Sequence, residues 1–314
     1  MSKRDKTLGV VLGHAVADAL GVPVEFESRE DLKKEPVVGM RGYGSHAVPA
    51  GTWSDDTSMA IAALDSLANG IDYEDMMSKF FSWANDNKYS AIGELFDIGV
   101  STRVALLRFG IKIPALKCGG DGENDNGNGS LMRIYPVVLY WHYLTEEKRN
   151  VLDLIDLVFK CSSLTHAHLR SKLACAIYTY VMLQILQEPS KEAVLWGLEE
   201  AKTKLRVFGD ELRHYDRLFK NDFAELPETE IQSSGYVVAT LEAAIWCLLN
   251  SDSYAECVLK AVNLGHDTDT VGAVAGSLAG AMYGMSEIPN EWVKALQNSE
   301  LLYQVCENFA NSNS

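Results

Sequence analysis

Residues 265–284 read GHDTDTVGAVAGSLAGAMYG, and this stretch decides the fold class. Behind its acidic head, glycine returns at every fourth position, at Gly272, Gly276, Gly280 and Gly284. Residues four apart lie on one face of an α-helix. Since a glycine inside a helix costs up to about 1 kcal/mol, a whole stripe predicts that another backbone packs closely against this face.

A second stripe of small residues lies near the start of the chain. The segment 7–21 carries it on one helical face, at Gly9, Gly13, Ala17 and Gly21. We therefore expect two central helices that pack tightly in a protein core. A membrane-spanning pair is not expected, because the longest apolar runs, 173–186 and 271–285, are shorter than the ~20 residues that span a bilayer.

The rest of the chain repeats the helical period and contains few strand signals. Apolar residues recur at i, i+3, i+4 and i+7, and prolines fall between the periodic segments. Further helices are expected at 54–69, 73–87, 91–109, 130–144, 150–161, 167–187, 190–204, 233–250, 253–264 and 290–309. Because no linker interrupts the chain, the sequence predicts an all-α protein with one compact domain, 1–314.

Charge and cysteine usage limit the partners and the compartment. With 28 basic and 43 acidic residues, the net charge of −15 argues against nucleic acid and suits a protein that collects cations. The six cysteines lie far apart with no CxxC pair, so we expect reduced, buried thiols rather than disulfides. Since no secretory signal is recognisable, a cytoplasmic protein is expected.

Two short polar clusters stand at the heads of apolar helices. They are Ser54, Asp55 and Asp56 at one helix, and Asp267, Asp269 and Thr270 at the other. Capping explains each cluster alone, because acids in a first turn interact favourably with the helix dipole. If the two heads meet, however, four carboxylates converge, and divalent cations that prefer oxygen ligands resolve their repulsion. The residues alone leave capping and a two-cation site both open.

Two further acids and one loop are candidates for chemistry. Glu25 follows the first striped helix on a loop, and Asp97 lies inside an apolar stretch that is expected to be helical. The glycine-rich loop 117–129 precedes another helix, where backbone N–H groups can bind an anion. The alternative for Glu25 and for Asp97 is a solvent-exposed acid without a role in chemistry. The alternative for the loop is a plain connection that binds no anion.

One histidine pair and one aromatic residue complete the set of candidates. His166 and His168 suggest a metal pair, although caps and core contacts are commoner roles for histidines at a helix start. Tyr236 begins another apolar helix, where an aromatic side chain usually belongs to the core.

Six stretches in this order resemble the ADP-ribosylglycohydrolase family. They are 13–25 (GHAVADALGVPVE), 51–57 (GTWSDDT), 126–136 (NGNGSLMRIYP), 164–168 (LTHAH), 234–249 (SGYVVATLEAAIWCLL) and 265–284. The pairing of GTWSDDT with GHDTDTVGAVAG is the most specific part. The segment 206–232 matches nothing in the family pattern, and Ala17 stands where relatives commonly have glycine.

The resemblance implies a compact single-domain orthogonal helix bundle with two Mg²⁺ or Mn²⁺ ions. By position, the family's metal ligands correspond to Ser54, Asp55, Asp56, Asp267, Asp269 and Thr270. Glu25 corresponds to a family glutamate near the metals and is, with Asp97, a candidate catalytic base. The positions where relatives contact ADP-ribose include Asp97, Asn128, Gly129, Ser130, His166 and Tyr236.

The resemblance also implies an activity and its partners. We expect hydrolysis of the N-glycosidic bond between ADP-ribose and an arginine of a modified protein. One alternative keeps the fold and cleaves an O-linked ADP-ribose, on serine or in O-acetyl-ADP-ribose. Another is an immunity protein that binds and neutralises an ADP-ribosyltransferase toxin.

Overall fold

The structure, a computed structural model, describes residues 2–312 and is built from helices. Their bounds are α1 Lys3–Gly21, α2 Arg29–Lys34, α3 Asp55–Leu67, α4 Tyr73–Asp86, α5 Val100–Gly110, α6 Tyr135–Tyr143, α7 Glu146–Val151, α8 Leu154–Ser163, α9 Leu169–Gln187, α10 Lys191–Leu205, α11 Gly209–Leu212, α12 Val237–Leu249, α13 Tyr254–Val262, α14 Thr268–Tyr283, α15 Asn290–Ala295 and α16 Ser299–Asn311. Over these residues no strand forms, only two isolated bridges. The all-α prediction is confirmed.

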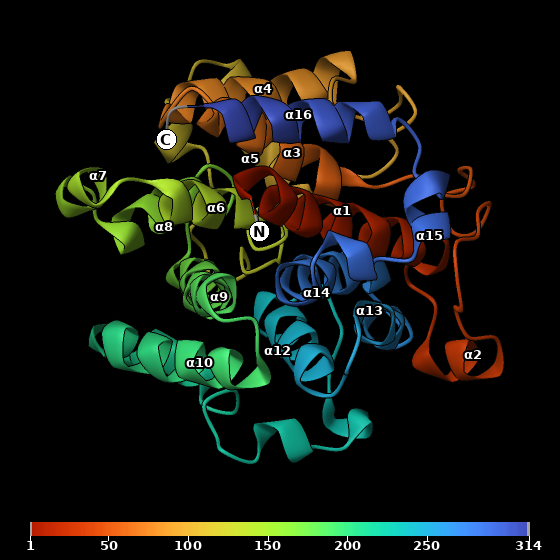
Figure 1. Ribbon diagram of the computed structural model, residues 1–314. Helices are drawn as coiled ribbons and strands as arrows, with labels where there is room; N and C mark the ends of the chain where they lie inside the picture. Colours follow the sequence, from red (N-terminus) through yellow and green to blue (C-terminus); the bar gives the residue numbers. More distant parts are fainter. Residues whose placement is uncertain (1, 313–314) are drawn as a thin grey trace.

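The two glycine-striped helices, α1 and α14, pack against each other at the centre of the molecule (Figure 1). A methyl group on Gly276 would lie 2.3 Å from the carbonyl oxygen of Gly13, and one on Gly280 would lie 2.1 Å from that of Gly9. Such distances exclude any side chain at these positions. The predicted close approach is therefore confirmed, and the methyl of Ala17 is accommodated opposite the glycines of α14.

The two helices run antiparallel, which decides where their ends meet. Gly9 lies opposite Gly280, whereas Gly21 lies against Asp269 at the start of α14. The Thr268 hydroxyl donates to the Gly21 carbonyl oxygen at 2.8 Å. The C-terminal end of α1 is thereby placed beside the acidic head of α14.

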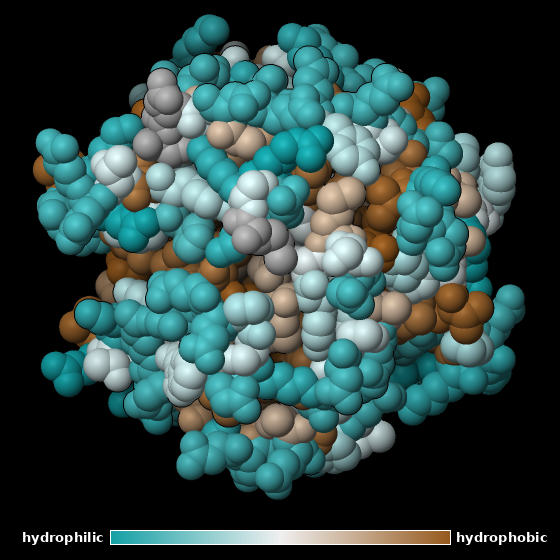
Figure 2. Space-filling view, viewed as in Figure 1, coloured by the Kyte–Doolittle hydropathy of each residue, from teal (hydrophilic) through white to brown (hydrophobic). Residues whose placement is uncertain are grey.

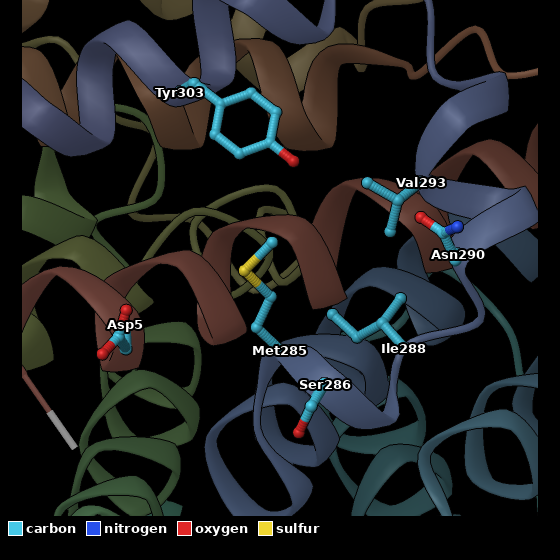
Figure 3. A pocket seen from close by; sticks show the side chains of 7 residues that line it. All are labelled: Asp5, Met285, Ser286, Ile288, Asn290, Val293 and Tyr303. Carbon is cyan, nitrogen blue, oxygen red and sulfur yellow. The ribbon is translucent and has the colours of Figure 1, made fainter.

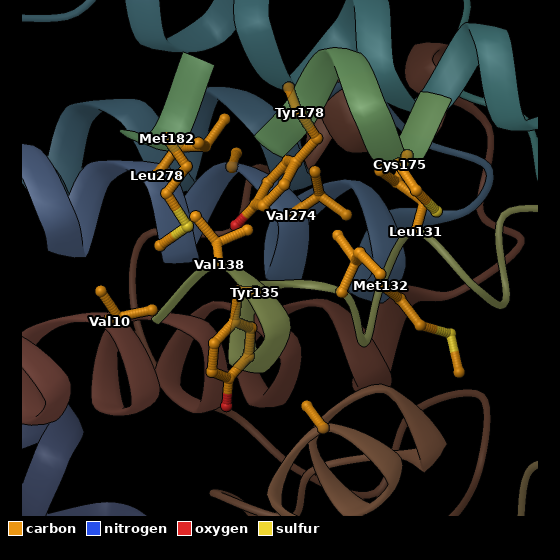
Figure 4. Close-up of a cluster of buried hydrophobic side chains, with 14 of the residues drawn as sticks. Val10, Leu131, Met132, Tyr135, Val138, Cys175, Tyr178, Met182, Val274 and Leu278 are labelled. Atoms are coloured by element: carbon orange, nitrogen blue, oxygen red, sulfur yellow. The ribbon is translucent and has the colours of Figure 1, made fainter. Parts of the chain in front are cut away.

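Buried side chains from four helices fill the space beside this pair (Figure 4). Val10 of α1, Tyr135 of α6, Tyr178 of α9 and Val274 of α14 belong to one continuous hydrophobic core. The Tyr178 hydroxyl shares a hydrogen bond of 2.8 Å with Ser277, which satisfies both buried polar groups. The outer face is mostly hydrophilic (Figure 2), as expected for a chain with 23% charged residues.

One helical stretch, Lys3–Val24, is long and apolar enough to cross a membrane by composition, with a mean hydropathy of 1.5. Its glycine stripe over 7–21 predicted a core helix rather than a membrane span. Its most apolar window is entirely buried inside the protein, where the glycine stripe packs against α14. Its apolar character is therefore explained by its central place in the core.

Several expected helices are shorter than their apolar pattern suggested. The stretch 91–99 is irregular, because Tyr89 and Gly93 adopt positive φ angles of 63° and 75°, and α5 begins only at Val100. Asp97 therefore lies on a loop, not inside a helix. The segment 290–309 is two helices, broken where Asn298 adopts a left-handed conformation. Apolar spacing alone does not show these breaks.

Other differences concern the connecting segments. The long stretch after α1 contains the short helix α2, which Ser28 caps by accepting from the Asp31 N–H. The expected helices 130–144 and 233–250 begin later, at Tyr135 and Val237. The segment 206–232 consists of single helical turns that cover one end of α12.

Candidate active site

The acidic heads of α3 and α14 meet in the folded chain. Ser54 caps α3 by accepting from the Asp56 N–H at 3.2 Å, and its hydroxyl donates to Asp56 Oδ2 at 3.0 Å. The Thr270 hydroxyl, at the head of α14, reaches the same Oδ2 atom at 3.3 Å. The convergence that the sequence left open is therefore present.

The head of α14 is not capped by its own acid. Asp267 occupies the N-cap position without a side-chain cap bond, and its Oδ2 accepts from the Asn128 amide at 2.8 Å instead. The carboxylate oxygens of Glu25, Asp267 and Asp269 come within 4.8 Å of one another. Capping therefore does not account for this cluster, whose carboxylate oxygens form a candidate cation site.

A third helix contributes a carboxylate beneath the same head. Asp18 of α1 is fully buried and accepts from the backbone N–H groups of Ser54 and Thr57 and from the Thr57 hydroxyl at 2.6 Å. It thus satisfies N–H groups at the first turn of α3 from outside that helix. The sequence analysis gave Asp18 no role, because its contacts join segments far apart in the chain.

Burial and crowding disfavour the charged forms of these acids. The pKa values of Asp55, Asp56 and Asp269 are raised well above the usual aspartate value, first by burial and then by neighbouring carboxylates. Burial likewise raises the pKa of Asp18 to about 7. Within residues 2–312, the ion pair that reaches this cluster joins Glu25 to His46. The protein thus supplies little positive charge of its own.

The donor set fits hard divalent cations. It consists of carboxylate and hydroxyl oxygens, which Mg²⁺ and Mn²⁺ prefer. Asp56 Oδ1 is buried without a hydrogen-bond partner among the described residues. Because an unpaired buried carboxylate oxygen is costly, this atom is suited to ligate a cation. The residues that offer these oxygens are the six candidate metal ligands predicted from the sequence: Ser54, Asp55, Asp56, Asp267, Asp269 and Thr270.

Glu25 and Asp97 lie beside this cluster, and ligand atoms of Glu25, His46 and Asp97 come within 4.8 Å of one another. The His46 Nε2 atom contacts the Glu25 carboxylate, and its ring lies 5.2 Å from that of Phe96. Burial raises the pKa of Glu25 and of Asp97, whereas the hydrogen bond with Glu25 raises the pKa of His46. His46 was missed because nothing in the glycine- and proline-rich stretch 22–53 marks it.

A cavity of about 270 Å³ opens onto these groups. Its walls bring together Glu25, Asp55, Asp97, Asp267 and Thr270 with residues of the 126–129 loop. Another cavity, of about 540 Å³, lies at the opposite end of the α1–α14 pair, near Asp5, Met285 and Tyr303 (Figure 3). That larger cavity contains no comparable group of acids, so the smaller one is the candidate active site.

The glycine-rich loop reaches the cavity as predicted but offers fewer free N–H groups than expected. Asn128 and Gly129 line the wall, and a methyl group on Gly129 would lie 2.8 Å from His166 Cε1. The Asn128 N–H is already used, since it donates to the Gly235 carbonyl at 3.1 Å. Ser130 does not line the cavity; its buried hydroxyl accepts from Ser162 at 2.9 Å.

The remaining predicted residues are His166 and Tyr236, together with His168, the proposed partner of His166. His166 lines the cavity, and burial lowers its pKa to about 3, so its imidazole is neutral. Tyr236 is 36% exposed and does not belong to the core. His168 is no partner of His166, because it caps α9 by accepting from the Arg170 N–H and lies near Glu123.

Comparisons with known proteins agree with this geometry. The model of the ADP-ribosylglycohydrolase family matches residues 1–314. An ADP-ribosylarginine hydrolase, Tri1, of Pseudomonas putida is 32% identical over 96% of this chain and 77% of its own length. The ADP-ribosyl-[dinitrogen reductase] glycohydrolase of Rhodospirillum rubrum is 30% identical over 94% of this chain and 91% of its own.

A solved structure is similar over the entire chain. It is described as an ADP-ribosylglycohydrolase-related protein complex, superposes with a TM-score of 0.82 and is 32% identical. The alignment covers 100% of this chain and 99% of that one. The orthogonal helix bundle expected from the sequence is thereby confirmed.

Proposed function

Because the chain belongs to the ADP-ribosylglycohydrolase family, we propose that this hydrolase cleaves the N-glycosidic bond between ADP-ribose and an arginine of a modified protein. The observation that carries the proposal is the convergence of the α3 and α14 heads around the unpartnered Asp56 Oδ1. Two relatives of about equal similarity support it, because both the protein of Pseudomonas putida and that of Serratia proteamaculans are named ADP-ribosylarginine hydrolase Tri1.

We further propose that two Mg²⁺ or Mn²⁺ ions are held at these heads. Their six ligating residues are Ser54, Asp55, Asp56, Asp267, Asp269 and Thr270. Bound divalent ions act as Lewis acids that orient oxygen groups and stabilise developing negative charge. Four carboxylates at one point need such charge, because burial and mutual repulsion raise the pKa values of three of them, Asp55, Asp56 and Asp269, well above the usual value.

The side chains around the cavity then have distinct tasks. Cleavage of the bond passes through a transition state that resembles an oxocarbenium ion. Water adds to the anomeric carbon of the ribose while the bond from that carbon to the arginine nitrogen breaks. Glu25, oriented by His46, takes the proton of this water, and the protonated guanidinium of the substrate leaves as neutral guanidine, which then takes up a proton. Asp97 is close enough to share this task. Asn128, Gly129 and His166 line the part of the cavity that receives the rest of the ADP-ribose.

The test is the release of ADP-ribose from two substrates, one modified on arginine and the other on serine. With Mg²⁺ we expect release from the arginine-linked substrate, and EDTA should abolish it. Release from the serine-linked substrate alone would contradict the proposed linkage, and full activity in EDTA would contradict the role of the metal.

Two further predictions concern the setting of this activity. Six free, buried thiols support a cytoplasmic protein, because reducing compartments keep cysteines unpaired. Binding of an ADP-ribosyltransferase toxin stays a prediction. An Asp55→Ala, Asp267→Ala double variant that still protects cells from such a toxin would favour it, whereas loss of protection would favour catalysis.

A further inference from the structure

Phe26 and Val100 belong to the wall of the cavity but not to the core. Both line its wall, yet Phe26 is 74% exposed and Val100 is 80% exposed. Phe26 follows Glu25 directly, and Val100 follows Gly99, whose backbone N–H donates to the Asp55 carboxyl. Two large apolar side chains therefore flank the acids at the mouth of the site.

The backbone at Phe26 is strained. Its φ angle is +66°, a left-handed conformation that costs free energy for any residue with a side chain. Two hydrogen bonds hold it there: the Phe26 N–H donates to the His266 carbonyl at 2.6 Å, and the His266 N–H donates to the Glu27 carbonyl at 2.7 Å. His266 itself has a φ of +64°.

This strain gives the folded chain no packing in return. A phenyl ring in solvent loses the stabilisation that burial would provide. Phe26 therefore combines two unfavourable features, an exposed ring and a positive φ angle. Strain of this kind is characteristic of functional sites, where the surrounding structure over-determines the conformation. The ring is thus positioned for a ligand.

The direction of the substrate identifies that ligand, an argument that rests on the proposed function. The ADP-ribose occupies the cavity, and the bond to be cleaved lies at Glu25, the proposed base. The polypeptide is attached on the other side of this bond and is too large for a cavity of about 270 Å³, so it lies outside, at the rim beside Glu25. Phe26, which follows Glu25, and Val100 are the large apolar side chains that line the cavity and stay exposed, so the polypeptide passes over them.

We propose that Phe26 and Val100 form a docking surface for the polypeptide on either side of the modified arginine, with a preference for apolar neighbours. Exposed aromatic and aliphatic side chains beside a catalytic cavity bind a chain by covering apolar area. The surface is continuous with the cavity, so one substrate occupies both.

The experiment compares kcat/KM for an ADP-ribosylated protein with kcat/KM for free ADP-ribosyl-arginine. In the Phe26→Ala, Val100→Ser double variant, the ratio of the two should fall about tenfold, the usual effect of removing an interface anchor. Val151→Ser is the matched control, because Val151 is also 80% exposed but does not line the cavity. Its ratio should equal that of the wild type.

A second variant separates docking from folding. Phe26→Gly removes the ring and also relieves the positive φ, so its Tm should stay level or rise while the ratio falls. The proposal would be overturned if the ratio stayed within about twofold of the wild type in both variants. This holds whether kcat/KM is unchanged for both substrates or falls equally for both. A wild type that hydrolyses neither substrate would instead refute the proposed function, and the docking surface with it.

Discussion

The Thr270 hydroxyl donates a hydrogen bond to Asp56 Oδ2 at 3.3 Å, although the two residues are 214 positions apart. This contact joins the head of α14 to the head of α3. The contact shows directly that the two acidic helix starts lie in one site. The other oxygen of Asp56, Oδ1, has no protein partner among the described residues, so it is available to a cation.

Substitution of Asp56 should remove the metal site. Asp56→Asn keeps the shape of the side chain but lowers its affinity for cations, so activity should fall by at least ~100-fold, more than replacement of an outer-shell residue causes. Titration calorimetry with Mn²⁺ should show the matching loss of binding. Asp252→Asn is the control, because Asp252 is exposed and pairs with Lys191. Normal Mn²⁺ binding by Asp56→Asn would refute the assignment.

Asp18 should stabilise the head of α3. Asp18→Ala leaves three buried donors of Ser54 and Thr57 without an acceptor. At 1 kcal/mol or more each, the free energy of unfolding should fall by about 3 kcal/mol. Urea denaturation measures this change. Thr57→Val removes only one of these bonds, so it should cost about 1 kcal/mol, and equal losses in both variants would contradict the idea.

The close approach of α1 and α14 should not tolerate a methyl group. In Gly276→Ala the added Cβ would lie 2.3 Å from the Gly13 carbonyl, so the helices must separate, at a cost of about 2 kcal/mol or more. Thermal denaturation should show a clear fall in Tm. Gly39→Ala serves as the control, because its Cβ would lie at an ordinary 3.4 Å from the Trp292 Nε1 atom. A Gly276→Ala variant as stable as the control would contradict this packing.

His46 should act as a positioning residue for Glu25. Because its Nε2 contacts the Glu25 carboxylate, His46→Ala should lower kcat by about 10- to 100-fold, as loss of an orienting partner does. KM should change little. His46→Gln, which retains a hydrogen-bonding group, should restore part of kcat, and His214→Gln at an exposed site should match the wild type. A pure KM effect would refute the role.

The metal-free protein should lose stability as pH rises. Burial raises the pKa of Asp18 to about 7 and those of Asp55, Asp56 and Asp269 well above their usual value. Near neutral pH the folded state therefore holds more protons than the unfolded state, and the free energy of unfolding falls as these protons leave. The contribution is complete below about pH 4 and is lost through about pH 7 and above.

Two measurements check whether the free energy of unfolding falls as pH rises. In EDTA, Tm should fall between about pH 7 and about pH 8, a window in which the buried histidines His14 and His166, with pKa values lowered to about 3, stay neutral. Added Mg²⁺ should raise Tm more at the higher pH, because the cation competes with protons for the carboxylates. A Tm in EDTA that rises over this window would refute the assignment.

Local patterns were enough to predict most of the long helices, the two glycine stripes and the polar residues at both helix heads. These features depend on neighbours within a few turns, and residues such as Gly276 and Ser54 show their roles by spacing alone. The resemblance of six stretches added the family. The irregular stretch that carries Asp97 was missed, because its apolar residues pack against the core without forming a helix.

Only the tertiary structure decided which distant groups share a site. The sequence shows four acids at two helix starts, but their meeting depends on α1 and α14 running antiparallel, and that follows from packing summed over the whole core. For the same reason Asp18 and His46 gained roles that no motif announces, and Ser130 turned away from the cavity into the protein. The spacing of residues along the chain shows which of them share one face of a helix. It does not show which helix faces pack against each other, because that depends on the packing of the whole core.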